Sequence, residues 1–92
     1  MTDSELHRLL QKVRAEMDKA RKADLDDDGR DLLRRLGRDI NELLEQTGGV
    51  PLQPKQSMLR GLEQAVEHFE MTHPALTMAL SELLTALSNA GI

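Results

Sequence analysis

The last 19 residues of the chain, Pro74 to Ile92, carry a single charge, Glu82, although 30% of all residues are charged. At 100° per residue, the leucines of this segment fall on one arc of a helix and four alanines lie beside that arc. The remaining face holds Thr, Ser and Asn residues, which are polar but uncharged. Surface helices normally expose Lys and Glu, so we expect this helix to be covered on more than one side, by its own chain and by a second copy.

The apolar arc is therefore the predicted interface between copies. Alanines beside leucines would permit close approach of two helices. The residues of this predicted interface are Leu76, Ala79, Leu80, Leu83, Leu84, Ala86 and Leu87.

The first half of the chain predicts an antiparallel helical hairpin over residues 1–47. Apolar residues recur in steps of three and four in two stretches separated by the acidic turn 24–29. Two stripes of equal length joined by a short turn are typical of such a hairpin. The stripes are Leu6, Leu10, Val13, Met17 and Ala20, and then Leu33, Leu36, Ile40 and Leu43.

The second half predicts two more helices after a linker at residues 48–56, which contains two prolines. A third helix would bury Leu59, Leu62, Val66 and Phe69. The chain must kink or restart at Pro74, because the residue before a proline avoids the α region, and Thr72 or His73 would cap the final helix. We expect a Thr2-x-x-Glu5 capping box at the first helix, and at the end of the chain Gly91 as a C-terminal cap with Ile92 folding back.

These patterns predict one all-α domain over residues 1–92, assembling as an oligomeric helical bundle. The core would consist of leucine: the chain has 17 Leu, one Phe and no Trp, Tyr or Cys. Cores of this kind specify geometry poorly, and oligomerisation is a common remedy in small domains. No apolar stretch reaches about 18 residues and no apolar segment follows the acidic N-terminus, so we expect no membrane partner and a cytoplasmic location.

The acidic turn matches the first half of an EF-hand calcium loop, with aspartates at 24, 26 and 28 before Gly29. The loop also needs an apolar residue at position 8 and a bidentate carboxylate at position 12, and these positions are Asp31 and Arg35. We therefore interpret the turn as an acidic cap on the second helix.

Glu70-x-x-His73 has the spacing of a di-iron ligand pair, but such sites need two pairs and further glutamates. We interpret His73 as a cap residue, and expect His68 to be exposed and His7 to lie in the charged first turn, without partners for metal or base chemistry. No metal or cofactor is predicted.

Four arginines, Arg30, Arg34, Arg35 and Arg38, cluster on the second helix. They could contact phosphate, but acidic residues lie within one turn of them, so a solvated face is the preferred interpretation. The net charge of −4 and the lack of aromatic or Gly-rich elements also argue against nucleic-acid binding.

Catalysis is not predicted. The chain has no Cys, no Ser in a glycine-flanked elbow and no carboxylate pair that stands apart from the helix-face charges. We also expect so small a bundle to have little room for a pocket of about 300 Å³ or more.

Most of the chain resembles a family of short bacterial proteins described only as a domain of unknown function. The resemblance rests on Phe69-Glu70, His73-Pro74-Ala75-Leu76-Thr77 and Ala86-Leu87-Ser88-Asn89-Ala90-Gly91-Ile92, with a further likeness at Leu9-Leu10 and the acidic turn, and it is most specific over residues 66–92. It implies a small helical protein with no established activity. Some relatives carry a chromosome-partitioning label, but this sequence has no nucleotide-binding motif.

The sequence thus favours a non-enzymatic, self-associating helical interaction module. The alternatives are an adaptor that binds a helix of another protein and, third, a chromosome-partitioning or nucleic-acid-associated accessory protein.

Overall fold

The computed structural model describes residues 3–45 and 56–90, and these form four helices. The helices are α1 (Asp3–Arg21), α2 (Asp27–Glu45), α3 (Gln56–Phe69) and α4 (Pro74–Ala90). The all-α prediction is confirmed, including the helical hairpin of α1 and α2. The predicted capping residue Thr2, the C-terminal cap at Gly91 and Ile92, and the linker except for Gln56 lie outside the described residues.

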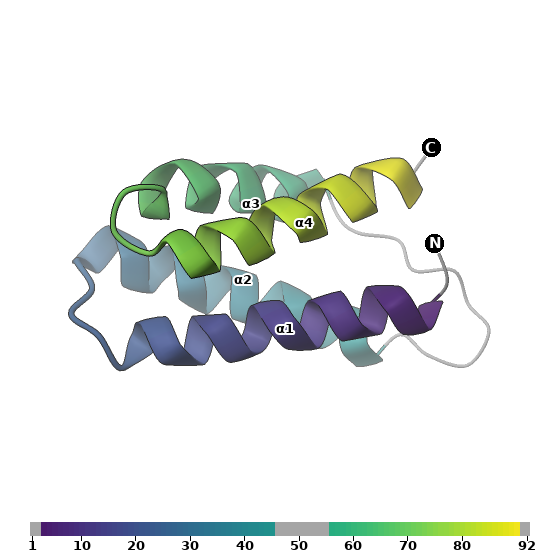
Figure 1. The fold of residues 1–92 in the computed structure, drawn as a ribbon, viewed down its shortest axis with the longest axis horizontal. Helices are drawn as coiled ribbons and strands as arrows, with labels where there is room; N and C mark the ends of the chain where they lie inside the picture. Colours follow the sequence, from purple (N-terminus) through teal and green to yellow (C-terminus); the bar gives the residue numbers. More distant parts are fainter. Residues whose placement is uncertain (1–2, 46–55, 91–92) are drawn as a thin grey trace.

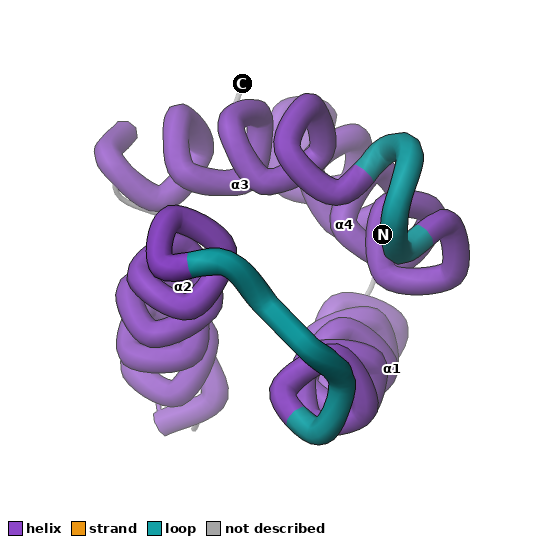
Figure 2. The backbone as a smooth tube through the Cα atoms, turned by 90° about the vertical axis from the view of Figure 1, so that its left-hand side faces the viewer, coloured by secondary structure: helices purple, strands orange, loops and turns teal. Residues whose placement is uncertain are grey.

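The helices pack as two layers, with the α1–α2 hairpin in one and the α3–α4 hairpin in the other (Figure 1). Seen along the bundle, each helix has two neighbours: α4 packs on α1 and α3, and α2 packs on α1 and α3 (Figure 2). The two short connections, residues 22–26 and 70–73, lie at the same end of the bundle. Both hairpins are therefore closed at one end, where their turns can touch.

The core follows the apolar stripes of α1 and α2. Every residue of the two predicted stripes is buried, from Leu6 to Ala20 in α1 and from Leu33 to Leu43 in α2. A helix with one apolar stripe buries that stripe against its neighbours, so the spacing of apolar residues alone predicts the buried side of α1 and α2.

The predicted stripe of α3 is partly wrong. Leu62 and Phe69 are buried as expected, but the fully buried positions beside them are Met58 and Ala65. Leu59 and Val66 are only partly buried at the edge of the core. Ala65 takes a core position of α3, and Leu59 and Val66 lie at its flank.

The connection between α3 and α4 separates two distinct helices. α3 ends at Phe69, and α4 begins at Pro74, whose fixed φ and missing N–H suit the first helical position. His73 stands immediately before it, and its carbonyl accepts the first helical hydrogen bond from the Thr77 amide at 3.0 Å. The predicted restart at Pro74 is confirmed, with His73 in the capping position.

Candidate interaction surfaces

The predicted interface residues lie in the core of the chain itself. Six of the seven are buried and the seventh, Leu84, is half-buried against the same core. The side of α4 that carries them packs on α1 and α3. The prediction that α4 packs on its own chain is confirmed. A contact with another copy would have to use other residues unless the bundle opened.

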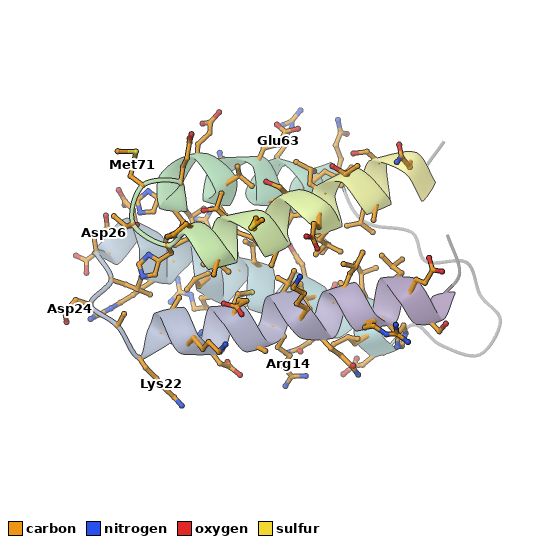
Figure 3. The ribbon with its side chains drawn as sticks, in the orientation of Figure 1. Arg14, Lys22, Asp24, Asp26, Glu63 and Met71 are labelled. Atoms are coloured by element: carbon orange, nitrogen blue, oxygen red, sulfur yellow. The ribbon has the colours of Figure 1, made fainter. Side chains whose placement is uncertain are left out.

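The outward side of α4 is exposed and nearly uncharged. Met78 is 67% exposed, and Ala75, Thr85, Ser88 and Asn89 are also exposed. Met71, in the turn before α4, is 90% exposed and projects from the end of the bundle (Figure 3). Among the described residues these two methionines are the exposed large apolar side chains.

The single charge of this outward side is compensated within the chain. Glu82 forms an ion pair with Lys12 of α1 at 3.4 Å, and both side chains are about half exposed. The pair neutralises the one ionised group on the surface of α4. We call this surface, formed by Ala75, Met78, Thr85 and Ser88, the α4 outer face.

The polar residues on the α3 side of α4 find partners in their own chain. The hydroxyl of Thr77 donates to the carbonyl of His73, four residues back, at 3.0 Å. Ser and Thr in helices commonly form this bond. Within the described part of the chain, no buried side-chain polar atom lacks a hydrogen-bond partner.

The acidic turn is a helix cap, as predicted. The carboxylate of Asp26 accepts the backbone N–H of Gly29 at 2.7 Å, and the carbonyl of Asp26 accepts that of Arg30 at 3.0 Å. This is the geometry of an N-cap residue. Residues 27–35 belong to α2, so the second part of the EF-hand pattern is helical rather than a calcium loop.

His68 departs from its predicted exposed position. Its ring N–H donates to the Asp26 carboxylate, with Nε2 and Oδ1 2.9 Å apart, and its side chain is only 28% exposed. This hydrogen bond, together with that from Gly29, holds the pKa of Asp26 below its ordinary value. The contact joins the start of α2 to the end of α3, at the closed end of the bundle (Figure 3).

Gly29 and Phe69 complete this junction. A Cβ on Gly29 would lie 2.7 Å from the Asp26 carboxylate, 3.2 Å from the Phe69 ring and 3.3 Å from His68. Phe69 is 1% exposed and packs edge-on against the rings of His68 and His73. The absence of a side chain at Gly29 therefore lets the two helices meet.

The Glu70-x-x-His73 spacing falls outside a helix. α3 ends at Phe69, so Glu70 and His73 occupy the turn instead of adjacent helical positions. The i, i+3 relation that would aim both at one metal does not apply there. No group of three or more His, Cys, Asp or Glu that could hold a metal ion occurs within residues 3–45 and 56–90.

The arginines of α2 border two surface grooves. Asp31 pairs with Arg34 at 2.5 Å and with Arg35 at 2.6 Å, so part of the cluster is compensated as expected. One groove, of about 430 Å³, lies between α2 and α3, and the other, of about 440 Å³, lies between α1 and α2. Arg38 borders both.

The expectation that so small a bundle lacks room for pockets is therefore wrong. The grooves form where helical glycines remove side chains from the floor, Gly61 in one and Gly37 in the other, and long arginines form the walls. Hydrophobic periodicity describes the core side of each helix and contains no information about such hollows.

The comparison with known families identifies the family of the chain. Residues 6–92 match the model of a family described as a domain of unknown function, DUF4404. The chain belongs to the DUF4404 family. No curated protein and no solved structure matches this DUF4404 chain. The match confirms the resemblance to a domain of unknown function and covers nearly the whole sequence.

Among the helices of the described residues of this DUF4404 chain, none is long and apolar enough to cross a bilayer.

Sequence reasoning missed two features of this DUF4404 chain. The pairing of Asp26 with His68 joins residues 42 positions apart, and no local spacing predicts it. Met78 lies opposite the leucine arc of α4, and the helical wheel of that segment could have identified it as an exposed apolar residue.

Proposed function

We propose that this DUF4404 chain is a non-enzymatic interaction module that associates with a second copy of itself through the α4 outer face. The observation that carries the proposal is an exposed helix face with one large apolar side chain, Met78, and no uncompensated charge, in a chain rich in charge. Interfaces are enriched in Met and depleted in Lys and Glu.

A second copy is the favoured partner because the α4 outer face is compatible with itself. In a two-fold dimer the same patch meets its copy, so a charged patch repels itself whereas a neutral one does not. Ala75, Thr85 and Ser88 are small, which lets two α4 helices approach.

The size of the face indicates a reversible dimer. A helix of 17 residues is about 26 Å long, and a strip about 10 Å wide covers on the order of 300 Å². Stable interfaces bury about 800 Å² per partner. We therefore expect the monomer to predominate in dilute solution and the dimer to form as concentration rises.

The second candidate is an adaptor that binds an amphipathic helix of another protein. The exposed methionines favour it, because flexible thioether side chains adapt to different apolar partners. Both candidates use the same face, and the mass of the purified protein separates them.

The test is the mass in solution, measured by light scattering over a wide range of concentrations. We expect the apparent mass to rise from that of one chain toward two, and the Met78→Lys variant to remain a monomer. Ala15→Lys is the matched control, because Ala15 is exposed on α1, away from this face. A mass that stays at one chain throughout, or an equal effect of both variants, contradicts self-association through this face.

Leu83→Lys would not serve as the test, although Leu83 belongs to the interface predicted from the sequence. Leu83 is fully buried, so a lysine there would unfold the chain instead of separating two copies.

A further inference from the structure

The groove between α2 and α3 has the composition of an anion site. Three arginines border it, Arg35 and Arg38 from α2 and Arg60 from α3, against one carboxylate, Asp39, among its described lining residues. The lining therefore has a formal charge of three minus one, or +2, in a chain whose net charge is −4. Positive charge is concentrated here against the trend of the whole molecule.

Two of the three guanidinium groups of this groove are unpaired within the described residues. Arg38 and Arg60 are exposed and form no ion pair or hydrogen bond within the described residues. Arg35 is held in place by Asp31 at 2.6 Å, which fixes its head group before any ligand arrives. A positioned arginine loses less conformational freedom on binding than a mobile one.

The floor and the neutral lining fit a small ligand with an anionic group. Leu36 lies 3.4 Å from the position that a Cβ on Gly61 would take, so Gly61 leaves room for about one methyl group in the floor. Ser57 and Gln64 add neutral hydrogen-bonding groups on the α3 side. The volume of about 430 Å³ lies within the usual range of small-molecule sites.

The groove between α1 and α2 is less suitable, although it is of similar size. Its Arg21 donates to the carbonyl of Leu33 at 3.4 Å and pairs with Asp18 at 3.4 Å. Its Arg34 is held by Asp31 at 2.5 Å. Two of its four arginines are therefore paired within the chain, against one of three in the α2–α3 groove.

We propose that the α2–α3 groove binds a soluble ligand through a phosphate or pyrophosphate group, held by Arg35, Arg38 and Arg60. The planar guanidinium fork matches the tetrahedral oxyanion and forms paired, charge-assisted hydrogen bonds with it. Ser57 and Gln64 donate to the remaining oxygens, and the apolar floor contacts the body of the ligand. This site is independent of the α4 outer face, which lies on another helix.

The test is calorimetric titration of the full chain with inorganic pyrophosphate at physiological salt. We expect saturable binding of one ligand per chain, weakened on the order of tenfold or more by Arg60→Gln or Arg38→Gln. Arg14→Gln, an exposed arginine of the other groove, is the matched control and should bind as the parent does. Circular dichroism verifies the fold of each variant.

Three outcomes would overturn the proposal. The first is the absence of saturable heat at millimolar pyrophosphate, and the second is an equal loss in all three variants, which indicates general charge attraction. The third is binding to phosphatidylglycerol vesicles or to double-stranded DNA without binding to pyrophosphate, which would assign the arginines to a surface contact.

Discussion

The three glycines within the described helices make a quantitative test of the packing. Each substitution by Ala gains about 1 kcal/mol of helix propensity at an interior position, so the surroundings of the added methyl group decide the sign. The nearest atoms differ sharply among Gly29, Gly37 and Gly61.

Gly61→Ala should stabilise the protein. The new Cβ meets only a methyl group of Leu36, at 3.4 Å, which is an ordinary contact distance. The expected gain of about 0.5–1 kcal/mol raises Tm by about 2–8 °C in a domain of this size.

Gly37→Ala should have a smaller effect. Its Cβ would lie 2.8 Å from Nη2 of Arg21, the far end of a flexible and half-exposed side chain that can move aside. The movement breaks a long hydrogen bond from Arg21 to the carbonyl of Leu33, which offsets part of the propensity gain.

Gly29→Ala should destabilise the protein. Its Cβ would displace the Asp26 carboxylate at 2.7 Å and press on the buried Phe69 ring at 3.2 Å. Overpacking a core costs about 1–3 kcal/mol, so after the propensity gain we expect a net loss of up to about 2 kcal/mol.

Thermal unfolding followed by far-ultraviolet circular dichroism measures the order of the three variants. We expect Tm to fall in the order Gly61→Ala, Gly37→Ala, parent, Gly29→Ala. A Gly29→Ala protein as stable as the parent would refute the close approach of α2 and α3, and a destabilised Gly61→Ala would refute the open floor of the α2–α3 groove.

Three further predictions concern individual side chains. The lowered pKa of Asp26 means that its charged form stabilises the fold above the unfolded pKa of about 3.9, and that this contribution is lost as the pH falls through the folded pKa. The parent should therefore have a higher urea midpoint than Asp26→Asn, which can still cap α2, at pH 7, and this difference should disappear in acid. A difference that is constant with pH contradicts the pairing with His68. Phe69→Ala should cost about 3–5 kcal/mol in denaturant unfolding, since the ring is fully buried, and a loss below about 1 kcal/mol would show that the junction is open to water. Glu82→Gln should change stability by less than about 1 kcal/mol, because its pair with Lys12 is half exposed, and a larger loss in the same assay would disprove that estimate.

The sequence-based predictions are accurate where the pattern of apolar residues within one helix determines the structure, and less accurate where packing between helices determines it. Stripes with leucine or isoleucine at every step, as in α2, predicted the buried face without error. In α3 the buried positions include Met58 and Ala65, and a ranking by hydrophobicity alone prefers Leu59 and Val66. Which of these residues is buried depends on how α3 fits against its neighbouring helices, and the sequence of one helix does not determine that fit.

The surface of α4 shows a different limit. Its lack of charge predicts that most of the circumference of α4 is covered, and the side that carries the leucines is buried. The outer part is exposed, with Met78 and small polar residues. The composition of a surface indicates whether a second protein could pack on it, but it does not indicate whether one does. The grooves beside α2 depend in the same way on the packing of pairs of helices, which places Arg60 beside Arg38.

Phe69 also determines how the molecule can be observed. It is the only Phe, and the chain has no Trp or Tyr, so ultraviolet absorbance and intrinsic fluorescence are almost silent. The aromatic region of a proton spectrum contains one phenyl ring and three imidazoles, and two of those imidazoles touch the ring. Ring-current shifts at Gly29 of α2, which this phenyl ring borders, would follow the docking of the two hairpins with no label attached to the chain.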